Sequence, residues 1–541
     1  MARDGGPGRG ARAVLPFLRV FLPVACWSGG RAATLRGVLT LTALLTAAGL
    51  EAPPGLADPV IERAVYDSRR AGPGALFVAV GGTRTDGHAH ALDAVRRGAA
   101  AVVAERPPEP ALPPGTPLVL VADSRAALAP LAARLCGDPS RRLTVAGVTG
   151  TDGKTTTVTM LHAAWRGAGI GAAALSTLDF RTLDRVEPNT SRQTTLESAD
   201  LHPRFGELLA AGCTHVALET SSHALELNRV DEVDFDAAVY TRITSEHLDF
   251  HGSREAYLEA KARLAAGVAA RAGGLLVLDR DDGFGFPRLD AVAAARRLTY
   301  SAAGDPGADL RATRVDAGPE GVRLAAETPW GDVEVQLRLA GRFNAANALA
   351  ALAAACATGA RLEDAAAGLE RLERVGGRME RVDLGQPFGV VIDYAHTAEA
   401  LRTVLGELRA ATRGRLWAVF GSAGERDAEK RPAMGEVAGR LADAVVLTDE
   451  DPRGEDRHQI LEEIAAGARA AGMRRGDTLV VVPDRAGAVA HAVEHARPGD
   501  TVLLAGKGHE SCILTAEGSV PWDERAVAEE AVRRWLVRHR D

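Results

Sequence analysis

Short runs of consecutive apolar residues, each closed by turn-forming residues, recur along the chain from about Ala57 onward, and Ala-rich stretches of helical character separate them. A strand that is buried on both faces lacks the alternation of apolar and polar positions. These runs therefore predict an α/β fold in which helices cover both faces of a sheet. The first three runs are ALFVAVGG (75–82), AAAVVAE (99–105) and PLVLVAD (117–123).

The same alternation begins again near Arg141 and near Gly376. The strand candidates are LTVAGV, THVALE, DAAVYTRI and LLVLD in the second segment, and VVIDYA, LWAVFG, ADAVVLTD, DTLVVVPD and DTVLLAGKG in the third. Strands and helices of the third segment alternate as a doubly wound sheet requires, and an amphipathic helix is expected at 525–538. We therefore expect three domains, at 34–140, 141–375 and 376–541, after a poorly ordered extension at 1–33.

The length of the chain agrees with three domains, and its composition, charge and cysteines indicate the class of protein. A chain of 541 residues is too long for one ordinary core, and 46% hydrophobic with 25% charged residues is typical of a soluble globular protein. The net charge of -7 argues against a general binder of nucleic acids or anionic membranes, although a local basic pocket stays compatible with it. The five cysteines form no CxxC pair, so neither a disulfide framework nor a zinc cluster is indicated, and the cytoplasm is the expected compartment.

The N-terminal segment superficially resembles a secretory signal, because Arg3, Arg9 and Arg12 precede an apolar run from Val14 to Cys26. Arg19 interrupts that run, and no uninterrupted apolar stretch reaches the ~20 residues of a membrane-spanning helix. An extension, or a start codon assigned too early, is the favoured interpretation over export. We expect no stable membrane insertion.

A glycine-rich turn between a predicted strand and a predicted helix, GVTGTDGKTTT (147–157), carries the sharpest chemical signal. Glycines let backbone N–H groups approach phosphate oxygens, Lys154 can reach the terminal phosphates, and Thr155 can hold Mg²⁺. The strict phosphate-loop pattern would place its first glycine where Val148 stands. A chance turn is the alternative, and the loop alone fits ATPases, GTPases and kinases equally.

The loop variant TG-T-x-GKTT resembles the Mur ligase family and its folylpolyglutamate synthetase relatives. Further blocks follow in that family's order and spacing, from about Thr34 to the C-terminus. They are YDSRRAGPGALFVAVGGTRTDGH (66–88), LETSSHALELNRV (218–230), EHLDFHGSREAYLEAKARL (246–264), GRFNAANALAA (341–351), GRMERV (377–382), IDYAHTAEAL (392–401), FGSAGERDAEKRPAMG (420–435), TDEDPRGED (448–456) and AGKGHE (505–510).

The resemblance implies a three-domain ligase with a central ATPase domain, acting as a monomer with ATP and Mg²⁺. The blocks together are most similar to family members that join meso-2,6-diaminopimelate to UDP-N-acetylmuramoyl-L-Ala-D-Glu in peptidoglycan synthesis. The chemistry agrees with this. A carboxylate is a poor electrophile, so an amide ligase first transfers the γ-phosphoryl group of ATP to it, and an amine then attacks the acyl phosphate.

The expected catalytic residues are Lys154, Glu219, His247 and Lys261. Glu219 ends a predicted strand beside the phosphate loop and is the expected Mg²⁺ ligand, unless it is a helix cap or a surface acid. His247 is a second ligand by resemblance, and zinc binding with His251 is discounted because no third ligand accompanies the pair. The resemblance also implies that CO2 carbamylates Lys261, which then helps to hold a second Mg²⁺; a solvated helix lysine is the alternative.

The resemblance also assigns three sets of binding residues. For ATP they are Gly150, Thr151, Asp152, Gly153, Lys154, Thr155, Thr156, Asn347, Arg378, Asp393 and His396. For the UDP-muramoyl dipeptide they are Tyr66, Ser68, Thr83, Arg84, Thr85, Thr194, Thr195, Ser221 and Arg229, with a plain surface turn as the alternative for the segment around Thr83. For the incoming amino acid they are Arg426, Glu450, Asp451, Pro452, Arg453, Gly506 and Glu510.

The choice of amino acid depends on Arg453. An arginine fork pairs with a second carboxylate, which diaminopimelate has and lysine and ornithine lack. A structural salt bridge is the alternative role for Arg453, and Glu510 is expected at the distal ammonium group.

Departures from the family pattern put the exact amino acid in doubt. Glu450, Asp451 and Asp152 stand where Asp, Asn and Asn are usual, and Leu196 and Leu227 replace a common Pro and Gln. Lysine, ornithine or a folate glutamate as the substrate, or a catalytically silent nucleotide-binding homologue, remain the competing interpretations.

Overall fold

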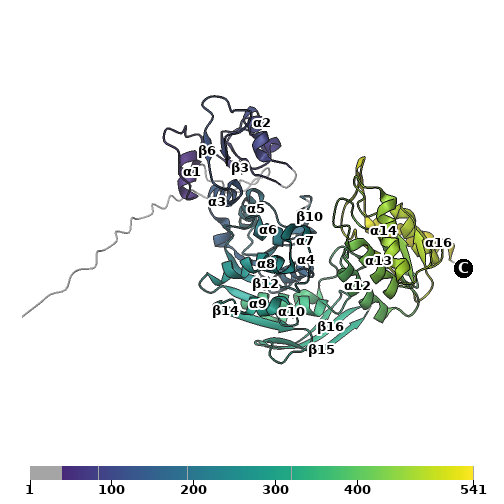
Figure 1. Ribbon diagram of the computed structural model, residues 1–541. Helices are drawn as coiled ribbons and strands as arrows, with labels where there is room; N and C mark the ends of the chain where they lie inside the picture. The colour runs from purple at the N-terminus through teal and green to yellow at the C-terminus, as the bar shows by residue number, and fades with distance from the viewer. Residues whose placement is uncertain (1–38, 83–84, 192, 319, 540–541) are drawn as a thin grey trace, which may run out of the picture. The chain divides into compact units, whose positions relative to one another are not determined.

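The computed structural model describes residues 39–539 except 83–84, 192 and 319. The expected extension at 1–33 and the predicted uridine-site residues Thr83 and Arg84 therefore lie outside the described residues. The helices and strands fall into three successive sheet regions, coloured purple to yellow along the chain in Figure 1.

The first region is a parallel sheet in the order β3-β4-β5-β6. Its central strands β4 (Ala75–Val78) and β5 (Ala101–Ala104) are fully buried, with apolar clusters on both faces, as the continuous apolar runs predicted. The other elements are β1 (Leu39–Thr40), α1 (Leu41–Ala47), β2 (Val60–Ile61), β3 (Arg63–Val65), η1 (Ser68–Arg70), η2 (Gly87–His90), α2 (Ala91–Arg96), β6 (Leu118–Leu120) and α3 (Ser124–Leu135).

The second region is an eleven-stranded sheet in the order β10-β9-β8-β11-β7-β12-β13-β14-β15-β16-β17. Strands β8, β11, β7, β12, β13, β14 and β15 run parallel, and antiparallel strands extend both edges, β9 and β10 on one side and β16 and β17 on the other. The strands are β7 (Thr144–Thr149), β8 (Ala172–Leu175), β9 (Asp179–Thr182), β10 (Arg185–Pro188), β11 (His215–Glu219), β12 (Phe235–Tyr240), β13 (Leu275–Asp279), β14 (Arg296–Ser301), β15 (Leu310–Gly318), β16 (Gly321–Thr328) and β17 (Gly331–Leu337).

Helices cover both faces of the parallel strands in this region. One apolar cluster joins the sheet to α4, α10 and α11, and another joins it to α5 and α8. The helices are η3 (Pro139–Arg142), α4 (Lys154–Gly167), α5 (Ser198–Ala210), α6 (Ser222–Glu226), α7 (Leu248–His251), α8 (Arg254–Ala269), α9 (Gly285–Asp290), α10 (Asn344–Ala357) and α11 (Leu362–Glu370). All four predicted strands of this segment are confirmed, as β7, β11, β12 and β13.

The third region is a six-stranded sheet in the order β18-β19-β23-β20-β21-β22, parallel except for β18. Helices α12, α13 and α14 pack on one face and α15 and α16 on the other, so the predicted doubly wound sheet is confirmed. The elements are β18 (Glu380–Arg381), β19 (Gly389–Asp393), α12 (Ala398–Ala411), β20 (Leu416–Phe420), α13 (Lys430–Leu441), β21 (Ala444–Leu447), α14 (Arg457–Ala470), β22 (Leu479–Val481), α15 (Arg485–His495), β23 (Thr501–Ala505), β24 (Cys512–Thr515), β25 (Gly518–Pro521) and α16 (Glu524–Arg538).

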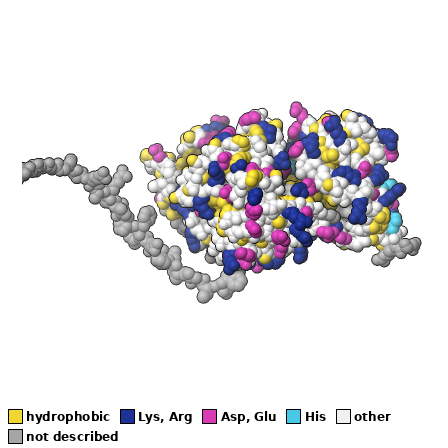
Figure 2. All heavy atoms as spheres, turned by 90° about the horizontal axis from the view of Figure 1, so that it is seen from below, with side chains coloured by type: hydrophobic (Ala, Val, Ile, Leu, Met, Phe, Trp, Pro, Cys, Tyr) yellow, Lys and Arg dark blue, Asp and Glu magenta, His cyan; other side chains and the backbone are white. Residues whose placement is uncertain are grey.

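The surface carries mixed charge. On the face shown in Figure 2, acidic and basic side chains are interspersed and form no large patch of one sign. Among the described residues, every helix is too short or too polar to cross a bilayer.

Candidate active site

The phosphate loop connects β7 to α4 through two glycines in conformations that other residues rarely adopt. Gly150 has φ +152° and Gly153 has φ +85°. A Cβ atom at Gly150 would lie 1.9 Å from Thr241 Oγ1, and one at Gly153 would lie 2.4 Å from Asn347 Oδ1. No side chain of the described residues caps the N-terminus of α4. Its first N–H groups and the helix dipole can therefore bind phosphate.

A hydroxyl and a carboxylate meet beside this loop. Glu219 ends β11, which pairs with β7, and both of its carboxylate oxygens accept from Thr155 Oγ1, at 3.1 and 3.0 Å. The backbone N–H of Thr177 donates to Glu219 Oε2 at 2.9 Å. Both side chains are 2% exposed. They form the hard-oxygen pair that suits Mg²⁺ at a phosphate site, and Lys154 Nζ, 2.7 Å from the Thr151 carbonyl, lies at the start of the same helix.

Lys261 is buried behind the phosphate loop. Its ammonium group donates to the Gly150 carbonyl at 2.7 Å and lies 4.5 Å from the centroid of the Tyr257 ring. Burial, together with the charge of Lys154, lowers the pKa of Lys261 well below its ordinary value. An uncharged amine is nucleophilic, so this lysine is suited to covalent modification.

Glu246 was absent from the predicted site, yet its carboxylate lies beside two of the predicted histidines. Its carboxylate is 3.7 Å from His247 Nε2 and 3.8 Å from His396 Nε2. Burial raises the pKa of Glu246, but His247, Lys154 and His396 outweigh burial and bring it to about 2. The sequence signal was an acid immediately before His247, at the start of the EHLDFHG block.

The rings of His223, His247 and His251 lie close together. His247, at φ +55°, lies edge-on to His223 with ring centroids 4.6 Å apart, while His223 stacks on Phe250 at 4.3 Å. His251 contacts Ser222 Oγ at 3.0 Å. Burial lowers the pKa of His223 to about 4. Among the described residues, no group of three or more His, Cys, Asp or Glu side chains is arranged to hold a metal ion.

The remaining predicted ATP residues separate into two groups. Asn347 packs against the loop and accepts from Thr157 Oγ1 at 3.3 Å. The Arg378 guanidinium carbon lies 4.6 Å from the centroid of the Tyr394 ring, and the buried Nε of Arg378 has no hydrogen-bond partner among the described residues. In contrast, Asp393 accepts from the Met379 and Ala395 N–H groups, both at 2.8 Å, so both of its oxygens hold backbone in place.

The predicted dipeptide residues form a connected polar group. Thr195 Oγ1 donates to the Glu219 carbonyl at 2.8 Å and accepts from the Ser221 N–H at 3.1 Å. Arg229 forms an ion pair with Glu197 at 2.8 Å. Thr194 accepts from Thr177 Oγ1 at 3.1 Å. This group is therefore connected to Glu219 in two ways, through the Glu219 backbone carbonyl and through Thr177, whose N–H donates to the Glu219 carboxylate.

The first sheet region places the other predicted substrate residues. The Tyr66 hydroxyl donates to Asp200 at 3.3 Å, and burial together with Asp200 raises the pKa of Tyr66 to about 12. Ser68 opens η1, and Thr85 is exposed. These positions leave the Ser68 and Thr85 side chains accessible to a ligand.

A pocket of about 480 Å³ brings two predicted arginines together. Arg426 and Arg453 line it with residues of the β24–β25 hairpin. Arg453 has φ +54°, its N–H donates to the Leu514 carbonyl at 2.9 Å, and its buried Nε has no hydrogen-bond partner among the described residues. Two guanidinium groups in one pocket are suited to a carboxylate.

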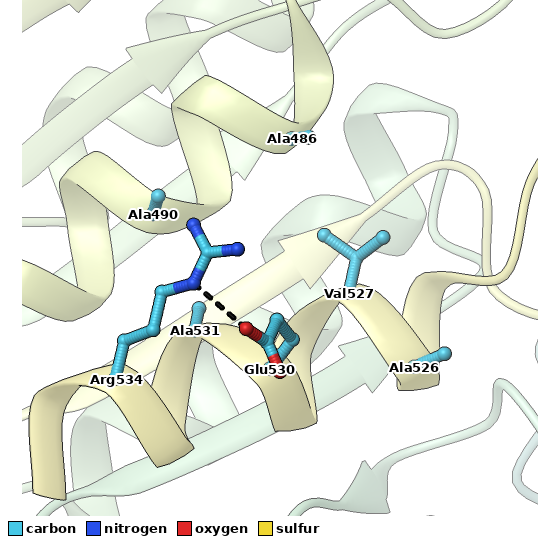
Figure 3. A pocket seen from close by; sticks show the side chains of 7 residues that line it. All are labelled: Ala486, Ala490, Ala526, Val527, Glu530, Ala531 and Arg534. Carbon is cyan, nitrogen blue, oxygen red and sulfur yellow. Dashed lines mark hydrogen bonds and ion pairs between the residues drawn. The ribbon is translucent and has the colours of Figure 1, made fainter. Parts of the chain in front are cut away.

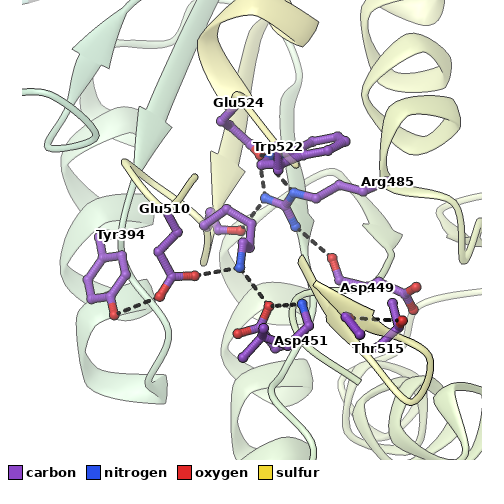
Figure 4. Close-up of polar contacts among 12 residues, drawn as sticks. Tyr394, Asp449, Asp451, Arg485, Glu510, Thr515, Trp522 and Glu524 are labelled. Carbon is purple, nitrogen blue, oxygen red and sulfur yellow. Dashed lines mark hydrogen bonds and ion pairs between the residues drawn. The ribbon is translucent and has the colours of Figure 1, made fainter. Parts of the chain in front are cut away.

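The acidic residues predicted for this pocket differ in their surroundings. Glu450 is buried, which raises its pKa, and its Oε2 has no hydrogen-bond partner among the described residues. Gly506, at φ +100°, leaves room beside that oxygen, because a Cβ there would lie 3.4 Å from it. Asp451, next to Pro452, instead uses Oδ1 to accept from Lys507 Nζ at 2.8 Å and from the Leu514 N–H at 2.9 Å. Figure 4 shows Asp451 and Glu510 as parts of one polar network, in which each accepts a hydrogen bond from Lys507.

A second groove lies between α15 and α16 and has a volume of about 340 Å³. Figure 3 shows that small side chains line it and that Arg534 pairs with Glu530 one turn away on α16. Its lining offers little beyond that exposed ion pair, so it does not extend the site.

Comparisons with known proteins agree with this geometry. Three family descriptions match: "Mur ligase family, catalytic domain" at residues 61–135, "Mur ligase middle domain" at 148–355 and "Mur ligase, glutamate ligase domain" at 377–508. A UDP-N-acetylmuramyl-tripeptide synthetase of Roseiflexus sp. (strain RS-1) is 48% identical over 88% of this chain and 95% of its own length. A UDP-N-acetylmuramoyl-L-alanyl-D-glutamate–2,6-diaminopimelate ligase of Streptomyces coelicolor is 41% identical over 90% of this chain and 95% of its own length.

A solved structure of a UDP-N-acetylmuramoyl-L-alanyl-D-glutamate–2,6-diaminopimelate ligase also matches the fold. It is 28% identical, with a TM-score of 0.63 over 92% of this chain and 99% of that one.

Proposed function

The chain belongs to the Mur ligase family, and from this premise we propose that it is an ATP-dependent ligase. It joins a diamino acid to the D-Glu carboxylate of UDP-N-acetylmuramoyl-L-Ala-D-Glu in peptidoglycan synthesis and forms ADP and phosphate. The observation that carries the proposal is the buried contact of Thr155 with Glu219 at a phosphate loop whose glycines cannot be replaced without a clash. The near full-length similarity to tripeptide synthetases supplies the substrate class.

In the proposed reaction, the N-terminus of α4 and Lys154 bind the ATP phosphates and orient the γ-phosphoryl group. Thr155 and Glu219 would hold Mg²⁺, which neutralises charge on the phosphates when bound. The γ-phosphoryl group passes to the D-Glu carboxylate and ADP leaves. The amine of the diamino acid then attacks the acyl phosphate, forms the amide and releases phosphate after losing a proton.

Lys261 is proposed to act as its carbamate, together with His247, at a second Mg²⁺. The uncharged amine attacks CO2, a C–N bond forms, and one proton is released. The product is an anion in place of a cation. Its buried position beside Thr149 and Gly150 puts that anion next to the phosphate loop.

We propose meso-2,6-diaminopimelate as the amino acid. The pairing of Arg426 with Arg453 in one pocket favours a substrate with a second carboxylate over lysine or ornithine. Relatives from Streptomyces coelicolor and Solibacter usitatus carry names that specify this amino acid. Glu510 is proposed to bind its distal ammonium group.

The proposed binding sites are divided among the three sheet regions. Residues 34–140 bind the UDP end, residues 141–375 bind ATP and the dipeptide, and residues 376–541 bring the amino acid. Arg378 and His396 of the last part complete the ATP site, and the Glu246–His396 pair joins the two parts at 3.8 Å. The enzyme is proposed to act as a cytoplasmic monomer.

The test is phosphate release from ATP with Mg²⁺ and UDP-N-acetylmuramoyl-L-Ala-D-Glu, in the presence of meso-diaminopimelate, L-lysine or L-ornithine. We expect turnover with diaminopimelate. Arg453→Asn should raise KM for diaminopimelate ~10- to 100-fold, since a charged hydrogen bond is lost. Arg440→Asn, an exposed arginine of α13, is the matched control and should change nothing. Turnover with lysine or ornithine alone would overturn the pocket assignment, and no turnover with any diamino acid would overturn the function.

A further inference from the structure

Lysine is rare in this chain, which has 64 lysines and arginines but only four lysines. All four lie in the blocks that resemble the ligase family: Lys154, Lys261, Lys430 and Lys507. Arginine and lysine are not interchangeable where a compact ammonium group must fit between oxygens. Lys154 and Lys261 already have proposed roles, and the structure gives the surroundings of Lys507 in detail.

Lys507 is fully buried between two carboxylates. Its Nζ donates to Asp451 Oδ1 at 2.8 Å and to Glu510 Oε2 at 2.5 Å. Both neighbours along the chain are glycines with positive φ, Gly506 at +100° and Gly508 at +51°. A Cβ at Gly508 would lie 2.9 Å from the Tyr394 side chain, so the backbone that turns Lys507 inward requires glycine there.

The ammonium group links two loops of the pocket. Asp451 follows β21 and is also held by the Leu514 N–H, whereas Glu510 follows β23. Burial lowers the pKa of Lys507, but Glu510 and Asp451 outweigh it and raise the pKa above its ordinary value. Lys507 is therefore charged, and without it two carboxylates would face each other with no cation between them.

The two oxygens of Glu510 differ. Oε2 is held by Lys507, and Oε1 accepts only a long bond of 3.4 Å from the Tyr394 hydroxyl. A hydrogen bond of that length is weak and is readily exchanged for an ammonium donor. Lys507 thus fixes the carboxylate and leaves Oε1 as the oxygen that can take a new partner.

We propose that Lys507 is a positioning residue that holds Glu510 against Asp451, so that Glu510 selects amino acids carrying a distal ammonium group. The inference rests on the proposed function. Asp451 is the anchor for Lys507, because its Oδ1 accepts from the ammonium group and from the Leu514 N–H.

The test compares a diamino acid with its analogue that lacks only the distal amino group. Steady-state kinetics are measured with meso-diaminopimelate and 2-aminopimelate, or with L-lysine and L-norleucine if wild type accepts lysine. Wild type should prefer the diamino acid. Lys507→Met should cut that preference ~10- to 100-fold through KM for the diamino acid, because positioning partners of a binding group typically contribute that much. The KM values for ATP and the UDP substrate should stay within about twofold, since only the amino-acid pocket is disturbed.

Further variants distinguish a positioning role of Lys507 from a general effect on the fold. Glu510→Gln should lose the same preference, and the double variant Lys507→Met/Glu510→Gln should lose little more, because the two residues act as a unit. Lys507→Arg should restore the preference only in part, since a guanidinium group does not fit the same two oxygens. Arg474→Met, an exposed cation of the same part of the chain, is the control and should behave as wild type.

Equal losses for the diamino acid and its analogue in Lys507→Met would overturn the proposal, because they would mean general damage to the fold. Additive losses in the double variant would also overturn it. A wild-type enzyme inactive with every diamino acid would instead reject the proposed function itself, and the inference with it.

Discussion

At Lys261 the surroundings change the chemistry of one side chain. Burial holds the pKa of Lys261 well below its ordinary value, which favours the uncharged amine, the form that reacts with CO2. The Gly150 carbonyl, 2.7 Å from Nζ, fixes where the resulting anion would lie. Burial and position therefore support the proposed modification, and neither could be read from the sequence spacing alone.

Removing this amine tests its role. Lys261→Ala should lower kcat at least ~100-fold, because the carbamate can no longer help to bind metal. Short carboxylates such as acetate should restore part of the activity by entering the space that remains. Arg263→Ala, on the exposed side of the same helix, is the control and should keep full activity. Unchanged activity of Lys261→Ala would contradict the assignment.

Single residues also mark the limit of what the sequence could predict. The motif spacing correctly predicted that Thr155 and Glu219 lie close together, because the ends of neighbouring parallel strands share one sheet edge. Glu246 and His223 were missed, since their importance arises from His247, His396 and Phe250 packing around them. The hydrogen bond between Asp451, a residue predicted for the amino-acid pocket, and Lys507 was also not foreseen.

At the scale of elements, the strand-to-helix turn of the phosphate loop depends on two glycine positions. Gly153 has φ +85° and no room for a Cβ against Asn347. Gly153→Ala should destabilise the fold by about 1–3 kcal/mol and lower kcat/KM for ATP, because backbone strain and the clash both displace the loop.

A matched glycine gives the control for this substitution. Gly406 lies within α12 with nothing within 4 Å of its added Cβ, and its φ is not positive. Gly406→Ala should stabilise the protein by about 0.5–1 kcal/mol, as alanine does in helix interiors. Thermal unfolding and ATP kinetics measure both variants, and a Gly153→Ala protein that matches wild type in both would contradict the geometry.

The strands buried on both faces were predictable, and those with one solvent face were not. Runs such as LLVLD became fully buried strands, whereas β17 alternates exposed and buried positions and belongs to the antiparallel edge β15–β16–β17. A continuous apolar run identifies the first kind, while the second requires the period-two pattern. The edge strands of the central sheet were therefore identified only in the structure.

At the scale of the whole molecule, buried uncharged histidines couple stability to pH. Burial lowers the pKa of His202 to about 4 from an ordinary value of 6.5. The unfolded chain takes up a proton below pH 6.5 while the folded chain does not, so the contribution of His202 is fully present above pH 6.5 and is lost as the pH falls toward 4.

The expected loss of stability at low pH can be measured. The thermal midpoint of the wild-type protein should fall between pH 6.5 and pH 4, and His202→Gln should fall less steeply over the same range. His458→Gln, an exposed histidine of α14, should leave the slope unchanged. Parallel curves for wild type and His202→Gln would remove His202 as a source of the pH dependence.

We expect one carboxylate oxygen of the muramoyl dipeptide to leave with the phosphate, because the proposed reaction activates the carboxylate as an acyl phosphate before the amine attacks. The most direct measurement uses UDP-N-acetylmuramoyl-L-Ala-D-Glu labelled with ¹⁸O in the D-Glu carboxylate, and mass spectrometry of the phosphate released. We predict one labelled oxygen in the phosphate for each amide formed. Unlabelled phosphate would contradict the account, because ATP would then be hydrolysed by water without activating the carboxylate.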